Sequence, residues 1–281
     1  EADSQFERGL AYCREALELR DQREQEPNLY VVYGDLLSDL KRYRKALDMY
    51  DEGLKKYPSS SLLFFNKGVV LIDQERYAEA EQIFKQTLLI NPYMYSSHFF
   101  LAIAALKQRK IIPGFLSLAG YLLINPEGKY GSKVINIMDV IAKSKDEIQE
   151  YKNKRNREPE ESYALVEEIV LSKIALEKAY KPLTALDDPI SRQLQVLVEK
   201  IEFNGQDTDF YMQYYVPFLK KLYTDGRFEL LVNRLFTSVN LEVIQNYNKK
   251  HKKEMQGLIN EAAAYFDEIR ATRELQYSKR S

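Results

Sequence analysis

A periodicity of 34 residues is the feature that most constrains what this chain can fold into. When the sequence is shifted by 34, the same kinds of side chain return at six positions. Two of these columns hold small residues, three hold large apolar residues, and one holds proline. The columns are Gly34, Gly68 and Ala102; Tyr43, Tyr77 and Ile111; Ala46, Ala80 and Gly114; Tyr50, Phe84 and Leu118; Leu54, Leu88 and Leu122; and Pro58, Pro92 and Pro126. Six coincident columns at one period predict three copies of one structural unit.

Each unit reads as a helix hairpin. Two amphipathic stretches are joined by a short polar turn, for example Asp39–Arg42 and Asp73–Arg76. We expect the small residues of the two helices to face each other and to let the helices approach closely, while the large residues fill the space between hairpins. The proline ends the second helix, because its ring cannot continue a helix and restricts the residue before it.

The three units, at about 27–60, 61–94 and 95–128, resemble the tetratricopeptide repeat in length, in their small residues and in their closing proline. The resemblance covers somewhat over a third of the chain. It implies an all-α fold, a right-handed α-α superhelix followed by further helices that extend or cap the array. The third unit departs from the pattern. His98 stands where the first two units have Tyr30 and Phe64, and Pro113-Gly114 opens its second helix.

The resemblance also implies a binding surface, because the first helices of such repeats line a concave groove that holds a segment of a partner protein. The corresponding positions are Asn28, Val31, Asp35, Ser38 and Asp39 in the first unit, Leu62, Phe65, Val69, Ile72 and Asp73 in the second, and Ser96, Phe99, Ile103, Leu106 and Lys107 in the third. One branch of the family grips a terminal carboxylate with Lys and Asn at these positions. This chain has Val31 and Asp35 there, so that function is not expected.

The groove positions are mostly apolar, and apolar surface of this extent is rarely left exposed to water. Two interpretations stay open. An amphipathic or apolar segment of a partner protein occupies the groove, or the C-terminal helices of the same chain fill it.

Outside the repeats the sequence predicts further helices. We expect a repeat array with flanking helices over residues 1–142, a charged linker or exposed helix over 143–161, and a C-terminal helical region over 162–281. Within that region, residues 210–238 resemble a degenerate hairpin, and residues 240–276 have apolar side chains at the 3–4 spacing of one long helix.

Composition narrows the class of partner and the compartment. The 41 basic and 42 acidic residues nearly cancel, so nothing global favours nucleic acid or an anionic membrane. The longest central stretch without charge, Ile111–Ile124, is too short to span a bilayer and predicts a buried helix. The single Cys13 excludes an internal disulfide. The absence of Met before Glu1 gives a slight lean towards an exported bacterial protein without its signal peptide.

Motifs for catalysis, for cofactors and for metals are missing from the sequence, so we expect no enzyme, no cofactor and no metal. His98 occupies an aromatic column, which favours packing. The pair Asp187-Asp188 precedes Pro189, which favours helix capping. Asp207-Thr208-Asp209 lacks the rest of a calcium loop. The basic clusters Lys152–Arg157 and Lys249–Lys253 have acidic neighbours, which favours solvated helix faces over phosphate contacts.

The sequence therefore predicts a non-catalytic scaffold or adaptor that binds a protein or peptide through an apolar groove. One alternative is a self-associating subunit whose own C-terminal helices fill the groove, and self-association through the terminal helix would make a homodimer. A second alternative is an enzyme or ligand-dependent regulator whose site lies in the C-terminal half.

Overall fold

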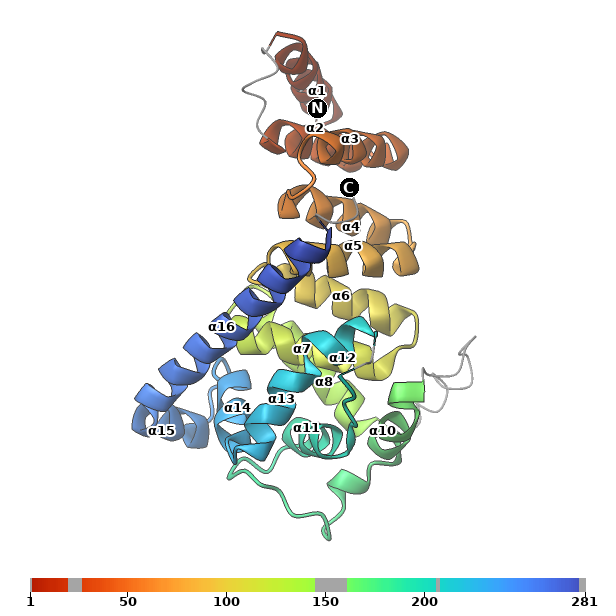
Figure 1. Ribbon diagram of the computed structural model, residues 1–281. Helices are drawn as coiled ribbons and strands as arrows, with labels where there is room; N and C mark the ends of the chain where they lie inside the picture. Colours follow the sequence, from red (N-terminus) through yellow and green to blue (C-terminus); the bar gives the residue numbers. More distant parts are fainter. Residues whose placement is uncertain (1, 20–26, 145–160, 206–207, 278–281) are drawn as a thin grey trace. The chain divides into compact units, whose positions relative to one another are not determined.

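The computed structural model describes residues 2–19, 27–144, 161–205 and 208–277 (Figure 1). The described residues form α-helices and one 3₁₀ helix, and none of them lies in a β-strand. The predicted all-α class is thus confirmed. The chain divides into two compact units, Glu1–Phe100 and Leu101–Ser281. We call them unit 1 and unit 2 and describe each by itself.

Unit 1 is built from helix hairpins at the predicted spacing. Its helices are α1 (Ala2–Leu19), α2 (Pro27–Asp39), α3 (Tyr43–Lys56), α4 (Ser61–Asp73), α5 (Tyr77–Ile90) and the first part of α6 (Tyr95–Lys107). The first helices begin at Pro27, Ser61 and Tyr95, which are 34 residues apart. α2 packs against α3, α4 packs against α5, and α2 also contacts α4. The sequence period is therefore a period of the structure.

The turn inside each hairpin has one repeated geometry. Lys41 and Glu75 both have a φ of 57°, in the left-handed region, and Arg109 has a φ of 64° at the same place in the third repeat. In the first turn the Arg42 N–H donates to the Leu37 carbonyl at 2.8 Å. The second and third turns repeat this bond, from Arg76 to Leu71 at 2.9 Å and from Lys110 to Ala105 at 3.0 Å. Each first helix therefore ends through backbone bonds made within six residues.

The glycines of the first helices lie against aromatic rings of the second helices. A Cβ placed on Gly34 would lie 2.2 Å from the ring of Tyr50, and one on Gly68 would lie 2.7 Å from the ring of Phe84. That the two small residues of a hairpin face each other stays a prediction. The glycine of the first helix makes room for the aromatic ring of the second helix, which a side chain there would displace.

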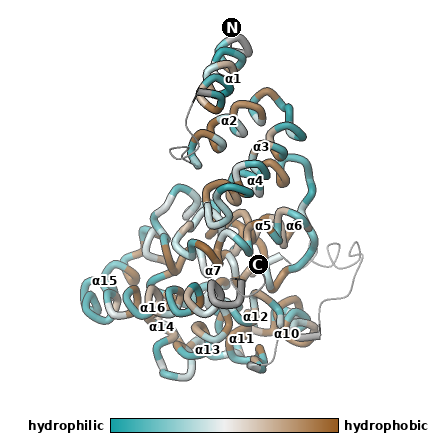
Figure 2. The backbone as a smooth tube through the Cα atoms, turned by 45° about the horizontal axis from the view of Figure 1, so that its top comes forward, coloured by the Kyte–Doolittle hydropathy of each residue, from teal (hydrophilic) through white to brown (hydrophobic). Residues whose placement is uncertain are grey.

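Unit 2 surrounds one apolar helix with the C-terminal part of the chain. Its elements after α6 are α7 (Ile111–Ile124), α8 (Gly131–Lys143), α10 (Glu161–Ser172), η1 (Ile174–Leu176), α11 (Pro189–Lys200), α12 (Phe210–Tyr214), α13 (Val216–Thr224), α14 (Phe228–Leu235), α15 (Glu242–Lys250) and α16 (Lys252–Tyr277). Every residue from Ile111 to Leu123 is buried. α8, α10, α12, α14 and α16 all pack against α7, a strongly hydrophobic stretch of the chain (Figure 2). The buried helix predicted at Ile111–Ile124 is confirmed, since a helix that is apolar on all sides must be covered on all sides.

Basic side chains from other elements close the C-terminal ends of three helices in unit 2. Arg234 of α14 donates to the carbonyls of Leu123 and Ile124, at 2.9 and 2.8 Å, at the end of α7. Lys173 donates to the Ile141 carbonyl of α8 at 2.6 Å. Lys220 of α13 donates to the Ile201 carbonyl after α11 at 2.5 Å. A cation suits this place, because the last carbonyls of a helix carry partial negative charge.

The predicted degenerate hairpin corresponds to α13 and α14, and its turn repeats that of unit 1. Gly226 has a φ of 70°, and the Arg227 N–H donates to the Leu222 carbonyl at 2.8 Å. Where the repeats have small residues, this hairpin has Leu219 and Leu231, which are both buried. It keeps the turn of the repeat and loses the close approach of its helices.

The structure differs from the prediction of one long helix at 240–276. α15 ends at Lys250 and α16 begins at Lys252, with His251 between them at φ −109° and ψ 33°. Asn248 donates to Thr237 at 3.4 Å, and His251 stacks on Tyr247 with ring centroids 4.3 Å apart. These polar contacts hold the break. The predicted linker at 143–161 lies almost entirely outside the described residues, so that boundary stays a prediction.

Candidate functional site

The predicted groove residues differ widely in their exposure. Four are exposed, namely Asn28, Leu62, Asp73 and Lys107. Six are half-buried, namely Asp35, Phe65, Val69, Ile72, Ile103 and Leu106. Val31 and Phe99 are buried, at 7% and 2% exposure. Solvent thus reaches most of the predicted positions, whereas Val31 and Phe99 belong to the packed interior.

In unit 1 the remaining positions define a surface on the adjacent helices α2 and α4. It comprises Asn28, Asp35, Ser38, Asp39, Leu62, Phe65, Val69, Ile72 and Asp73, and we call it the first-helix face. On α4 these residues recur at the 3–4 spacing that places side chains on one side of a helix. The face combines a half-exposed apolar strip with carboxylates.

Phe65 connects the first-helix face with the core of unit 1. Its ring centroid lies 6.0 Å from that of Phe84 on α5 and 5.7 Å from that of Phe100 on α6. Phe84 and Phe100 are stacked at 5.7 Å. Because these ring contacts hold Phe65 in place, the first-helix face has a rigid base. Phe65 thus packs against the core and also contributes part of its ring to the exposed face.

Asp35 is the most buried carboxylate of the face. It accepts a hydrogen bond from the Tyr50 hydroxyl at 2.6 Å. Burial raises the pKa of Asp35 above its usual range, the bond from Tyr50 opposes that rise, and the nearby charge of Asp39 adds to it. Asp35 thus lies near a second carboxylate and has no basic partner among the described residues.

Asp39 and Asp73 are the last residues of α2 and α4. Both are exposed, and neither forms an ion pair or a hydrogen bond with any residue that the structure describes. Burial raises the pKa of Asp73. Neither helix has a basic residue in its last turn. The negative end of each helix dipole thus carries another negative charge.

In unit 2, another helix covers the side of the α13–α14 hairpin that corresponds to the first-helix face. If the turns are aligned, so that Gly226 corresponds to Lys41, Lys220 of α13 corresponds to Asp35. Lys220 donates to the carbonyls of Val198 and Ile201 at the end of α11, and α11 packs against α13. Here α11 of the same chain packs against the surface that corresponds to the first-helix face. For the first three repeats, occupation by the C-terminal helices stays a prediction.

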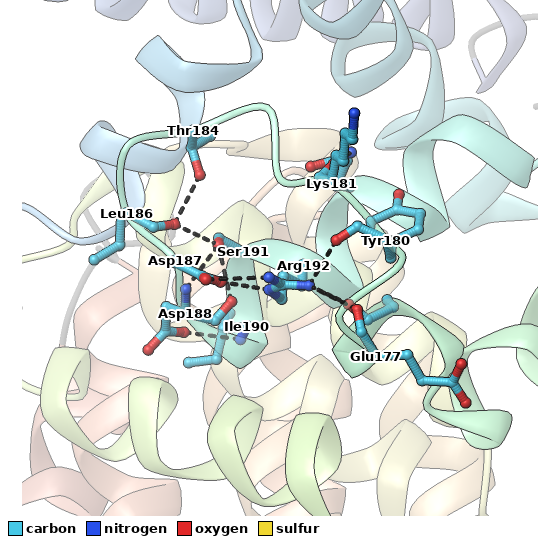
Figure 3. A network of polar contacts seen from close by, with 12 residues as sticks. Glu177, Tyr180, Lys181, Thr184, Leu186, Asp187, Asp188, Ile190, Ser191 and Arg192 are labelled. Atoms are coloured by element: carbon cyan, nitrogen blue, oxygen red, sulfur yellow. Dashed lines mark hydrogen bonds and ion pairs between the residues drawn. The ribbon is translucent and has the colours of Figure 1, made fainter.

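Arg192 is the centre of a network of polar contacts in unit 2 (Figure 3). Arg192 donates to the carbonyls of Ala175 and Tyr180, both at 2.9 Å, and forms an ion pair with Asp187. The guanidinium fastens the irregular segment 177–187 to α11. Its donors are used inside the protein, so the network explains the path of the chain and not a ligand site.

The other polar residues singled out in the sequence have structural contacts. Asp188 caps α11, accepting from the Ile190 N–H at 2.8 Å, so the predicted capping is confirmed. Asp209 likewise accepts from the Met212 N–H at 3.0 Å at the start of α12, while Asp207 lies outside the described residues. His98 is fully buried 2.9 Å from the Pro92 carbonyl, and burial lowers its pKa to about 4, as a packing role requires.

The predicted basic clusters, possible metal clusters and possible membrane spans were each compared with the described residues. Around the break between α15 and α16, four lysines are exposed, as expected for a solvated helix face, namely Lys249, Lys250, Lys252 and Lys253. The other cluster, Lys152–Arg157, lies outside the described residues. No three His, Cys, Asp or Glu side chains among the described residues come together as a metal cluster. None of the described helices is both long enough and apolar enough to cross a bilayer.

Val32 is an exposed apolar residue next to the predicted groove position Val31, and the sequence pattern did not indicate it. Val32 on α2 is 49% exposed, whereas its neighbour Val31, the predicted groove residue, is buried. α1 packs against α2, with Leu36 against Gly9. The sequence offered no signal for this, because the contacts of the first repeat depend on a helix that lies outside the period.

Two comparisons with known proteins gave matches. A sequence model described as "Tetratricopeptide repeat" matches residues 63–93, which include most of α4 and all of α5. One similar solved structure is described as "MamA RS-1 ArsTM double mutant". It shares 19% identity with this chain and has a TM-score of 0.44, and the match covers 54% of this chain and 83% of that one.

Proposed function

We propose that this chain, a tetratricopeptide repeat protein, is a non-catalytic scaffold that binds a segment of a partner protein on the first-helix face of unit 1. The observation that carries the proposal is the half-exposed apolar strip of α4. Leu62 is 39% exposed, and Val69 and Ile72 are half-buried on the same side of the helix. Aliphatic side chains at this spacing form a surface that favours contact with apolar side chains of another segment.

Rigidity supports the same proposal. Phe65, which belongs to the first-helix face, packs against the rings of Phe84 and Phe100. A surface that is already ordered loses little conformational entropy when a ligand binds. A partner segment would therefore meet a face that needs no rearrangement.

The test uses a displayed library of short peptides selected on the purified chain. The variant Leu62→Glu places a charge on the exposed strip without touching the core. Leu165→Glu is the matched control, because Leu165 on α10 is 62% exposed and lies in unit 2. We expect selected peptides to lose at least tenfold in affinity for Leu62→Glu and to bind Leu165→Glu as they bind the unchanged protein. Equal binding to all three proteins would remove the first-helix face from consideration.

Phe65 and Phe99 are poor choices for this experiment. Phe99 is 2% exposed, and Phe65 is part of the aromatic cluster. A charge at either position would be placed in the interior and would unfold the repeat, so a loss of binding would not identify the face.

A further inference from the structure

Three carboxylates on the first-helix face occupy electrostatically unfavourable positions. Asp35 and Asp39 lie one turn apart on α2, a spacing at which like charges repel each other. Asp39 and Asp73 lie at the C-terminal ends of their helices, where the helix dipole favours a cation. Among the described residues none of the three has a basic partner. The surface thus keeps three negative charges that lower the stability of the helices carrying them.

The same chain shows that these positions do not require acids. Lys107 is the last residue of α6 and stands in the same column of the repeat as Asp39 and Asp73. A lysine suits the dipole there, so the fold of the repeat accepts it. Elsewhere in unit 1, some carboxylates do have basic partners, as in the pairs of Asp51 with Lys67 and of Glu79 with Arg76. Unfavourable choices that local structure does not explain are typical of binding surfaces.

We infer that the segment that binds the first-helix face is apolar and basic, with lysine or arginine side chains next to the apolar residues that meet Leu62, Val69 and Ile72. This inference rests on the proposed function and names the chemistry of its partner. An incoming cation would pair with carboxylates that have no cation of their own, and it would also relieve the repulsion between Asp35 and Asp39.

The geometry gives the arrangement of the partner segment. The acids lie towards the C-terminal ends of α2 and α4, while Leu62 lies in the first turn of α4, eleven residues before Asp73. A rise of about 1.5 Å per residue separates these two positions by roughly 16 Å along the helix. The apolar residues of the partner therefore extend along α4 from Leu62 to Ile72, and its basic residues lie beside those that meet Ile72, next to Asp73.

The experiment uses three synthetic peptides with the same apolar residues and with lysine, glutamate or glutamine at the remaining positions. Binding to the full chain is measured by fluorescence anisotropy. We expect the lysine peptide to bind at least tenfold more tightly than the glutamate peptide. The preference should shrink between 0.05 and 0.5 M salt, since the carboxylates are reached by solvent.

Two variants with equal changes in charge identify the carboxylates. Asp39→Asn with Asp73→Asn removes two charges from the face. Asp48→Asn with Glu52→Gln removes two charges from exposed positions of α3 in the same unit. The lysine peptide should lose about tenfold in affinity for the first double variant and keep its affinity for the second. The variant Asp39→Lys with Asp73→Lys should instead prefer the glutamate peptide.

The outcomes separate this inference from the proposed function. If all three peptides bind equally and Leu62→Glu abolishes their binding, the face binds segments but the charge assignment is wrong. Binding of the lysine peptide that is indifferent to both double variants likewise overturns the assignment. If Leu62→Glu changes nothing, the proposed function itself fails.

A second copy of the chain is the remaining occupant to be tested. The exposed lysines Lys249, Lys250, Lys252 and Lys253 could meet the carboxylates of another molecule. Light scattering of the protein alone, over a range of concentrations, measures this. Self-association that is lost both in Asp39→Asn with Asp73→Asn and in Lys249→Gln with Lys250→Gln would assign the face to a second copy, and would overturn its assignment to a partner protein.

Discussion

The two units share one helix-ending turn, and unit 2 adds a second way of closing the end of a helix. In unit 1 a first helix ends through a left-handed residue and a backbone bond that spans six residues, as at Lys41 and Arg42. In unit 2 the end of α7 is closed by Arg234, which is 110 residues further along the chain than Ile124. Unit 1 thus depends on contacts within repeats and between neighbouring repeats, and unit 2 depends in addition on contacts between segments far apart in the chain.

The largest expected effect tests this difference at equivalent positions of the two hairpin types. In unit 1, Gly68→Ala adds a Cβ that would lie 2.7 Å from the Phe84 ring and should cost about 2 kcal/mol. In unit 2, Leu219 stands in the corresponding column and is 3% exposed. Leu219→Ala leaves a cavity and should cost about 3 kcal/mol. The free energy of unfolding of each variant is measured by guanidinium denaturation.

The two substitutions have opposite effects on side-chain volume. Unit 1 should not tolerate a larger residue, and unit 2 should not tolerate a smaller one. If Leu219→Ala were as stable as the unchanged protein, the α13–α14 hairpin would have the close packing of the repeats, and the structural comparison would be wrong.

The features that could be predicted from the sequence are those that depend on residues close together in the chain, and those that depend on distant segments could not be predicted. The period gave the hairpins, their turns and the bounds of the first helices, because each depends on residues close together in the chain. The apolar run Ile111–Ile124 predicted a buried helix, but not the helices that cover it. The caps from Arg234, Lys173 and Lys220 join distant segments and leave no local pattern. The same reason explains Val31 and Phe99, whose burial depends on packing beyond their own helices.

The second prediction removes a long-range cap. Arg234→Met keeps the length and apolar stem of the side chain but leaves the Leu123 and Ile124 carbonyls without their charged donors. Arg234 is largely buried, and burial lowers its pKa, so water replaces these bonds only in part. We expect a loss of about 2 kcal/mol in thermal or chemical denaturation.

The control is Arg76→Met at a turn of unit 1, where the guanidinium forms an exposed pair with Glu79. That variant should unfold like the unchanged protein, because exposed ion pairs contribute little. If both variants lost the same free energy of unfolding, the long-range cap by Arg234 would stabilise unit 2 no more than an exposed ion pair stabilises unit 1.

The third prediction concerns acid and unit 1. The pKa of His98 is lowered to about 4 in the folded chain, so the unfolded chain, with an ordinary pKa near 6.5, binds the proton first. Stability is therefore complete above about pH 6.5 and falls as the pH drops towards 4, by about 2 kcal/mol at pH 5. His98→Phe restores the aromatic residue of the other repeats and should remove this part of the pH dependence. If the two proteins lost stability in parallel between pH 7 and 5, His98 would not be the group responsible.

The smallest expected effects lie in the turns that the two units share. Glu75 adopts a φ of 57° in unit 1, and Gly226 a φ of 70° in unit 2. Glycine accepts this conformation and other residues are strained by it, so Glu75→Gly should be neutral or stabilising by about 0.5 kcal/mol. Gly226→Ala should cost about 1 kcal/mol, although a Cβ there would contact nothing within 4 Å.

Since a steric clash cannot explain a loss of stability at Gly226, a measured loss would come from the backbone conformation alone. A gain or no change for Glu75→Gly and a loss for Gly226→Ala, measured as shifts in the midpoint of chemical denaturation, would show that one turn geometry serves both units, despite the different ways in which their helices pack. If Gly226→Ala had no effect, the turn of unit 2 would have to relax to another conformation, and its likeness to the repeat would be confined to the sequence.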